Sequence, residues 1–144
     1  MTIATYQPDF VTVAFQGVPL TGFAPGTFVS AARNNDSWNI SVGSGGDATR
    51  AKSGDKSGRV TITLLGSSAS NAALSALAAN DERVGTSVGP LAVKDLSGAD
   101  VVFAGTAWIV KPPDIEKSNE ETNREWVFET DVLEMYAGGN VPVT

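Results

Sequence analysis

A series of carboxylates towards the C-terminal end of the chain is the largest group of side chains suited to acid–base chemistry. Paired carboxylates hydrolyse glycosidic bonds when they face each other across a cleft. Nothing in the spacing requires such a pair, so solvated surface charge is the simpler interpretation. Glu125, Glu129 and Asp131 share one parity in an alternating segment, so they would lie along one strand face and would give a pore a negative wall. The acids considered are Glu116, Glu120, Glu121, Glu125, Glu129 and Asp131.

The glycine-rich stretch VGSGGDATR at residues 42–50 is a second candidate, because glycine loops can cradle phosphate. Its spacing matches neither GxGxxG nor the P-loop pattern, and no helix is expected to begin after it. Calcium is also disfavoured, since Asp47 and Asp55 are isolated and lack the ligand spacing of an EF-hand loop. A flexible hairpin tip is the better interpretation, and no cofactor or metal site is expected.

The chain contains no cysteine and no histidine. Their absence removes disulfides, thiolate and imidazole metal ligands, cysteine nucleophiles and any Ser-His-Asp arrangement. Carboxylates, lysine, tyrosine or an oxygen-only metal site would have to do any catalysis. We therefore predict that the protein is not an enzyme and has no catalytic, cofactor-binding or metal-binding residues.

Three tryptophans offer a different chemistry, because indole rings stack on sugars in carbohydrate-binding β-sandwiches. Trp38, Trp108 and Trp126 all lie in alternating segments with apolar neighbours of the same parity. This pattern favours packing in a core. We predict that all three are core residues, with a carbohydrate-binding module as an alternative function.

The composition indicates one globular domain over residues 1–144, with 42% hydrophobic residues. A formal charge of −6 makes the chain a poor candidate for gripping nucleic acid, although an acidic surface could repel it. No apolar run is long enough for a membrane-spanning helix, and the first ten residues lack a secretory signal. Folding in a cytoplasm is the expectation.

Short alternating runs separated by Gly, Asn, Asp and Pro predict antiparallel strands. Alanine and leucine at helical spacing predict one helix within residues 68–82, capped by Ser68, Ser70 or Asn71. A single short helix of this kind usually covers one opening or face of a sheet. The predicted strands lie at residues 10–15, 18–23, 27–33, 37–42, 59–64, 91–96, 101–110 and 123–136.

Two segments are predicted to lie outside the core. Residues 43–58 are rich in Gly, Ser and charge and contain almost no large apolar side chain, so they should project as a long loop or hairpin tip. Residues 137–144 are predicted to form a flexible C-terminal tail.

The order of several short strings across residues 8–130 resembles the tail-tube proteins of contractile-tailed bacteriophages. None of these strings is a catalytic signature, and each alone is weak. Their order and spacing within a single domain carry the resemblance. The strings are TFVSAARNNDSW (27–38), VGSGGDATR (42–50), RVTITLL (59–65), SASNAALSAL (68–77), VGPLAVKDLSG (88–98), AWIVKPPD (107–114) and NREWVFE (123–129).

The resemblance implies a mainly β fold, with two packed antiparallel sheets or a flattened β-barrel and one short α-helix, similar to the type VI secretion tube protein. It also implies a structural virion protein that forms stacked, hexameric rings inside a contractile sheath. DNA would pass through the channel without specific binding. The implied partners are further copies of the chain and the sheath, baseplate and tape-measure proteins, with no membrane and with assembly in the host cytoplasm.

On this interpretation the projecting loop would contact the next ring, and the acidic strand face would line the lumen. The charged loop residues proposed for this contact are Asp47, Arg50, Lys52, Asp55 and Lys56, and the proposed lumen acids are Glu125, Glu129 and Asp131. A tail terminator, an adaptor ring protein and a carboxylate-based glycoside hydrolase remain alternatives. Ring number comes from the resemblance alone.

Overall fold

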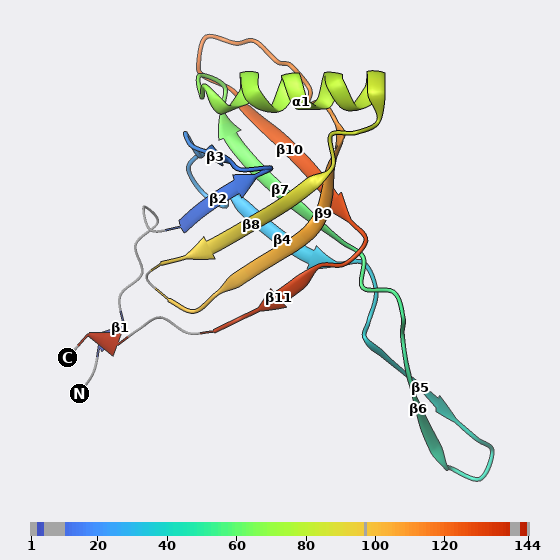
Figure 1. Cartoon of the computed structure of the whole chain (residues 1–144). Helices are drawn as coiled ribbons and strands as arrows, with labels where there is room; N and C mark the ends of the chain where they lie inside the picture. Colours follow the sequence, from blue (N-terminus) through green and yellow to red (C-terminus); the bar gives the residue numbers. More distant parts are fainter. Residues whose placement is uncertain (1–2, 5–10, 97, 139–141, 144) are drawn as a thin grey trace.

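The structure is a computed structural model that describes residues 3–4, 11–96, 98–138 and 142–143. Eight strands form one strongly curled antiparallel sheet in the order β3-β2-β8-β9-β10-β7-β4, with β11 also paired to β9 (Figure 1). The strands of this sheet are β2 (Val11–Phe15), β3 (Val18–Leu20), β4 (Val29–Arg33), β7 (Gly58–Leu65), β8 (Gly89–Asp95), β9 (Val101–Lys111), β10 (Asn123–Thr130) and β11 (Glu134–Tyr136).

The curled sheet packs on itself as two layers around one core. Strands β2 and β10 are not neighbours in the sheet, yet the rings of Phe15 and Phe128 meet edge to face with centroids 4.9 Å apart. Strand β9 joins the layers because its N-terminal half pairs with β8 and β11 and its C-terminal half with β10. The predicted mainly β fold with two packed antiparallel layers is therefore confirmed. Among the described residues the strands do not close into a barrel.

The one helix among the described residues, α1 (Ser70–Val84), lies across one end of the two layers, as predicted for a short helix of this kind (Figure 1). Leu74 and Ala78 of this helix are buried in the core. Gly85 ends the helix with φ of 74°, a left-handed conformation that glycine adopts without a Cβ penalty. The cap position itself is Ala69, which makes no side-chain cap, but Ser68, one of the predicted residues, lies one position earlier and its Oγ accepts a hydrogen bond from the Ser70 N–H at 3.2 Å.

Strand β10 confirms part of the predicted alternation. Trp126, Phe128 and Thr130 are buried. The strand ends at Thr130, whose Oγ1 accepts a hydrogen bond from the Val132 N–H at 3.3 Å, and the chain bends. After the bend Leu133 is buried and Val132 is exposed, so the predicted faces are wrong beyond Thr130.

The two ends of the described chain meet in a small separate sheet. Strand β1 (Ile3–Ala4) pairs antiparallel with β12 (Pro142–Val143). Residues 139–141 and 144 of the predicted flexible tail lie outside the described residues, so its flexibility stays a prediction. Within the described residues, no helix has the length and apolar character needed to cross a membrane.

Candidate assembly surfaces

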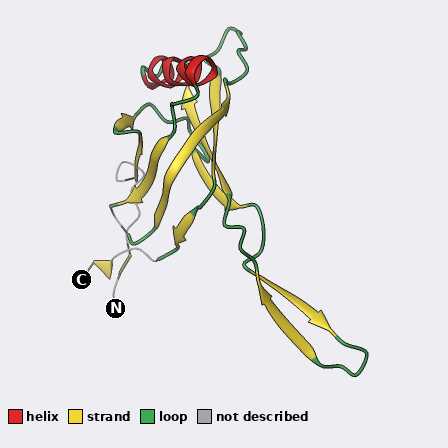
Figure 2. Ribbon diagram, turned by 45° about the vertical axis from the view of Figure 1, so that its right-hand side comes forward, coloured by secondary structure: helices red, strands yellow, loops and turns green. Residues whose placement is uncertain are grey.

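A two-stranded hairpin leaves the body at the end opposite α1 and projects away from it (Figure 2). Strands β5 (Trp38–Val42) and β6 (Ala48–Lys52) pair only with each other among the described residues. The turn between them is closed by the Gly43 N–H, which donates to the Asp47 carbonyl at 2.8 Å. The predicted projecting segment is thus a formed hairpin, hereafter the hairpin (residues 38–52), and not only a loop.

The two faces of the hairpin differ in chemistry. Directly opposed residues of an antiparallel pair place their side chains on the same face. The register therefore gives one face three apolar side chains from β5 and two cations from β6, and gives the other face Asn39, Ser41, Thr49 and Ala51. The first, here called the apolar–basic face, consists of Trp38, Ile40, Val42, Ala48, Arg50 and Lys52.

The apolar–basic face is open to solvent. Trp38, Ile40 and Val42 are 44%, 74% and 61% exposed. The Arg50 guanidinium lies over the Trp38 ring, 3.8 Å from its centroid. The prediction of Trp38 as a core residue is therefore wrong, and the strand predicted at residues 37–42 is exposed on both faces. Alternation correctly indicates a strand here, but the body offers this strand no surface to pack against.

Hydrogen bonds at the base fix where the hairpin leaves the body. The Ser53 N–H donates to the Ser37 carbonyl at 2.8 Å, and the Asn34 N–H donates to the Ser57 carbonyl at 3.0 Å. The Arg33 Nε donates to the Leu133 carbonyl at 2.9 Å, which ties the end of β4 to the segment before β11. These hydrogen bonds lie on the segments that enter and leave the hairpin, and they hold it in a fixed position on the body. We call these two segments the base of the hairpin.

Asp55 organises this base. Its carboxylate accepts hydrogen bonds from the Ser57 N–H, at 2.9 Å, and from the Asn35 amide. The hydrogen bonds from Ser57, followed by the one from Asn35, lower the pKa of Asp55 below its ordinary value. Because the folded-state pKa is below the unfolded one, the contribution of Asp55 is present at neutral pH and is lost as pH falls through the lowered pKa.

We therefore expect the hairpin base to loosen under acid while the body stays folded. The Ser57 amide NMR signal should move as pH is lowered from about 6 to about 2, across the range in which aspartates titrate. An Asp55→Asn variant should show no such movement at Ser57. A Ser57 signal that responds equally in both chains would contradict this role of Asp55.

The five charged residues predicted for inter-ring contact divide between the hairpin and its base. Asp47 lies in the turn, and Arg50 and Lys52 lie on β6. Asp55 and Lys56 belong to the base, where the Lys56 carbonyl accepts a hydrogen bond from the Leu133 N–H at 2.8 Å. Their contact with another ring stays a prediction.

The predicted lumen acids lie on a polar outer surface of β7 and β10. Register places Glu125 opposite Thr63, Val127 opposite Thr61, and Glu129 opposite Arg59. We call this surface the threonine face, and it consists of Arg59, Thr61, Thr63, Glu125, Val127 and Glu129. Asp131 is exposed but lies beyond the end of β10, so the prediction that all three acids line one strand is wrong for Asp131.

The threonine face is less negative than its acids alone suggest. Arg59 forms an ion pair with Glu129, and the two side chains are 54% and 31% exposed. Glu125 has no ion-pair partner among the described residues. Sequence reasoning missed this pairing because seventy positions separate Arg59 from Glu129, and only the register of β7 with β10 brings them together.

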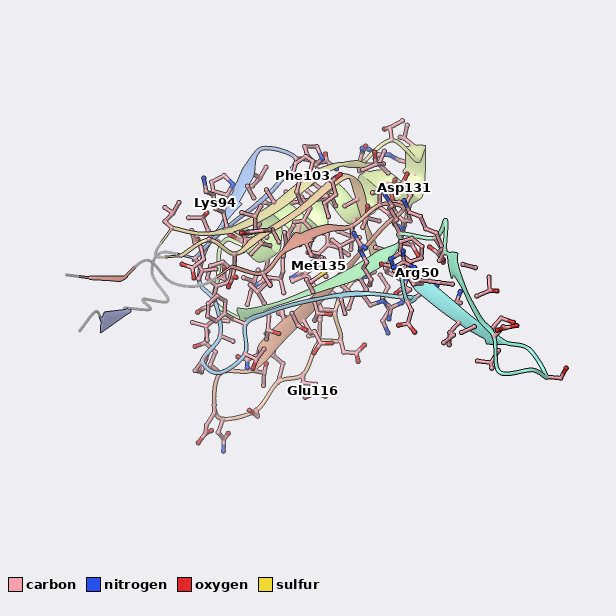
Figure 3. All side chains as sticks on the ribbon, turned by 90° about the horizontal axis from the view of Figure 1, so that it is seen from below. Arg50, Lys94, Phe103, Glu116, Asp131 and Met135 are labelled. Atoms are coloured by element: carbon pink, nitrogen blue, oxygen red, sulfur yellow. The ribbon has the colours of Figure 1, made fainter. Side chains whose placement is uncertain are left out.

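An apolar groove of about 510 Å³ opens where β4 faces β8, β9 and β11. Its lining includes Val29 and Ala31 of β4, Val102 of β9, and Met135 and Tyr136 of β11. Seen from below in Figure 3, Met135 lies between the strands of the two layers, and Arg50 lies on the hairpin. No sequence pattern pointed to this groove, because its walls come from segments that are distant in the chain.

The structure gives little support to the tryptophans as a sugar-binding site or to the acidic residues as a metal site. Trp126 is 1% exposed and is confirmed as a core residue, but Trp108 is only partly buried, on the outward parity of β9 between the buried Ala107 and Ile109. Among the described residues no three acidic side chains gather in a way that could hold a metal ion.

Solved structures of contractile injection systems share this fold. The chain superposes on the tube-terminating cap of the anti-feeding prophage with a TM-score of 0.59 at 10% identity, covering 92% of this chain and 91% of the cap protein. It superposes on a chain of the PVC sheath–tube complex with a TM-score of 0.58 at 11% identity, covering 92% of each chain. A chain of the PVC sheath/tube terminator gives 0.59 at 11% identity, covering 92% and 97%.

Sequence comparison adds the family. "Structural protein ORF10" of Pseudomonas phage KPP10 is 31% identical over 149 aligned residues, which cover 98% of this chain and 86% of that protein. The family described as Bacteriophage PhiTE tail tube protein matches residues 13–138, nearly the whole described body and hairpin. The chain belongs to this phage tail tube family and is a structural protein of the virion.

Proposed function

We propose that the chain assembles with itself into hexameric rings that stack to form the inner tube of a contractile tail. The observation that carries this proposal is the hairpin, which extends an apolar–basic face into solvent where no described part of its own body covers it. Solvent-exposed apolar side chains gathered on one face mark interaction surfaces. Family membership makes further copies of the tube protein the expected partners.

The proposed partners of the tube follow from its place in a contractile tail. The structural neighbours include a sheath–tube complex, which supports a sheath outside the tube. Baseplate and tape-measure proteins would bound the tube during assembly in the host cytoplasm. The protein would act through geometry alone, with no turnover and no cofactor.

The threonine face is the proposed wall of the channel. Of the cations beside this face, Arg59 is already neutralised by Glu129, and Lys111, which lies opposite Val127 on β9, has Glu125 nearby. DNA would therefore slide along this wall without being held. Glu125 is the acid with the greatest influence on this property, because it lacks a paired cation among the described residues.

Replacing Glu125 with Lys is expected to make assembled tubes bind short duplex DNA. The substitution leaves a cation beside threonines on the proposed wall, and phosphate binding of this kind weakens steeply with salt. Retention of a labelled duplex by pelleted tubes, measured at low and high salt, checks this. Glu120→Lys makes the same charge change on the connection between β9 and β10 and should retain less DNA. Equal retention by both variants would place Glu125 away from the channel.

A tail terminator is the second candidate function, because a cap and a terminator are among the structures with this fold. A terminator should form one ring and stop, whereas a tube subunit should stack ring upon ring. Sedimentation velocity over a concentration series separates the two. A single species with the mass of six subunits supports the terminator, and a growing series of multiples supports the tube.

A further inference from the structure

The hairpin and the groove are complementary in chemistry, and we propose that the hairpin of one copy docks in the groove of a second copy. The inference rests on the proposed self-assembly and names the surface on which the hairpin acts. In this arrangement the apolar–basic face lies against the groove, and Asn39, Ser41 and Thr49 stay towards solvent.

The apolar groups of the two surfaces match. The hairpin presents a tryptophan, an isoleucine and a valine in one row, all exposed. Most of the groove lining is apolar, and at about 510 Å³ the groove is within the size range of sites that hold drug-sized groups. Its β11 wall is itself open to solvent, with Met135 and Tyr136 44% and 66% exposed. Docking would remove both apolar surfaces from water, which is the main driving force for association.

The strands beside the groove can also supply main-chain hydrogen bonds. Among the described residues β4 pairs only with β7, and β11 pairs only with β9, so each has a second edge that no described strand occupies. An extended segment laid along such an edge adds to the sheet through its backbone, while alternate side chains enter the neighbouring pocket. The hairpin has this alternation, because its apolar side chains occupy every second position of β5.

Charge favours the same pairing. Arg50 and Lys52 lie on the docking face of the hairpin. Among the described residues that line the groove, the exposed charged side chain is acidic, Asp100 at the rim. Complementary charges of this kind fix orientation and speed encounter more than they add affinity.

The groove that receives the hairpin must belong to another copy. The hairpin projects away from the body that carries its own groove (Figures 1 and 2), and the hydrogen bonds of its base hold it there. A contact between two different surfaces of identical copies is head-to-tail, and it produces a ring if the rotation closes or a filament if it does not. One hairpin–groove contact per subunit is therefore a means of extending the assembly.

Two single substitutions test the pairing, each with a matched control. Ile40→Asp places an acid on the docking face, and Asn39→Asp places it on the opposite face of the same strand. Met135→Lys places a cation in the groove facing the basic hairpin, and Val84→Lys changes an exposed apolar residue at the end of α1. All four positions are exposed, so each variant should fold. Ile40→Asp and Met135→Lys should each weaken self-association about tenfold or more, and the controls should leave it unchanged.

Mixing the two defective chains gives the decisive result. The intact hairpin of the Met135→Lys chain can dock in the intact groove of the Ile40→Asp chain, but the resulting pair has no second working contact. Native mass spectrometry should therefore detect a one-to-one heterodimer from two variants that are monomeric alone. Because the natural chain lacks cysteine, Ile40→Cys mixed with Met135→Cys should also form a disulfide-linked heterodimer under oxidation, and Asn39→Cys mixed with Met135→Cys should not.

The outcomes separate this inference from the proposed function. If the natural chain forms rings or tubes and both variants assemble equally well, the hairpin–groove contact is wrong and the tube function stands. Folded variants that stay monomeric when mixed, with no cysteine cross-link, overturn the contact in the same way. If the natural chain stays monomeric at every concentration and the mixed variants form no heterodimer, the hairpin–groove contact and the proposed tube function are both wrong.

Discussion

A chain in which residues 38–52 are replaced by a two-residue Asn-Gly turn is expected to fold as stably as the natural protein and to form no tubes. The ends of the replaced segment are already adjacent, because the Ser53 N–H donates to the Ser37 carbonyl at 2.8 Å. Asn-Gly is the preferred connection across such a two-residue hairpin turn. Every residue of β5 and β6 is exposed, so the deletion removes no part of the core.

Urea denaturation and electron microscopy together check this expectation. The midpoint of unfolding should be unchanged, and rings or tubes should be absent. A control that keeps the hairpin length but replaces Trp38, Ile40 and Val42 with Thr should also fold and fail to assemble, since it keeps β-propensity but loses the apolar row. An unfolded deletion chain would show that the hairpin supports the body, and normal tubes would show that it is not the assembly arm.

Trp126→Ala is expected to destabilise the protein by about 3–5 kcal/mol, a large part of the ~5–15 kcal/mol typical of a folded domain. Trp126 is 1% exposed and packs in the main core cluster. Its Nε1 donates to Asn71 Oδ1 at 2.9 Å, and Asn71 Nδ2 in turn donates to the Leu65 carbonyl at 2.8 Å. The substitution therefore leaves a cavity and also removes the donor for a part-buried amide oxygen that joins α1 to β10.

Thermal unfolding checks the value, with an expected fall in midpoint on the order of 10 °C for a domain of this size. Trp126→Phe should cost less, about 1–3 kcal/mol, because most of the buried volume is kept and the hydrogen bond is lost. Trp38→Ala is the matched surface control and should change stability by less than about 0.5 kcal/mol. Equal effects at Trp38 and Trp126 would contradict the burial of Trp126 in the core.

The sequence predicts most strands because alternation is a local property of the chain. Segments such as 101–110 and 59–64 are found within two residues of their observed bounds, β9 and β7. Burial is not local, which is why Trp38 and Trp126 carry the same pattern and have opposite surroundings. Strand β6 was not predicted, for a related reason. Its residues are small or charged and none packs in a core, so they show no apolar alternation, and the strand forms because β5 lies opposite.

The candidate assembly surfaces show the same difference between features with a local sequence signal and features without one. Residues 43–58 lack large apolar side chains, which correctly predicts a projection, while its two-faced hairpin follows only from the β5–β6 register. Glu125 and Glu129 do share a face, but Asp131 does not lie on it because a bend after Thr130 ends the alternation. The groove and the Arg59–Glu129 pair depend on contacts between distant segments, and neither has a local signal.

Negative-stain electron microscopy of the purified protein across a concentration series tests the central claim of self-assembly most directly. The hairpin, its groove and the family together predict rings at low concentration and striated tubes of uniform width at high concentration, both lost in the 38–52 replacement. Isolated small particles at every concentration, from protein whose Trp126 stays buried and whose fold is intact, would contradict the claim.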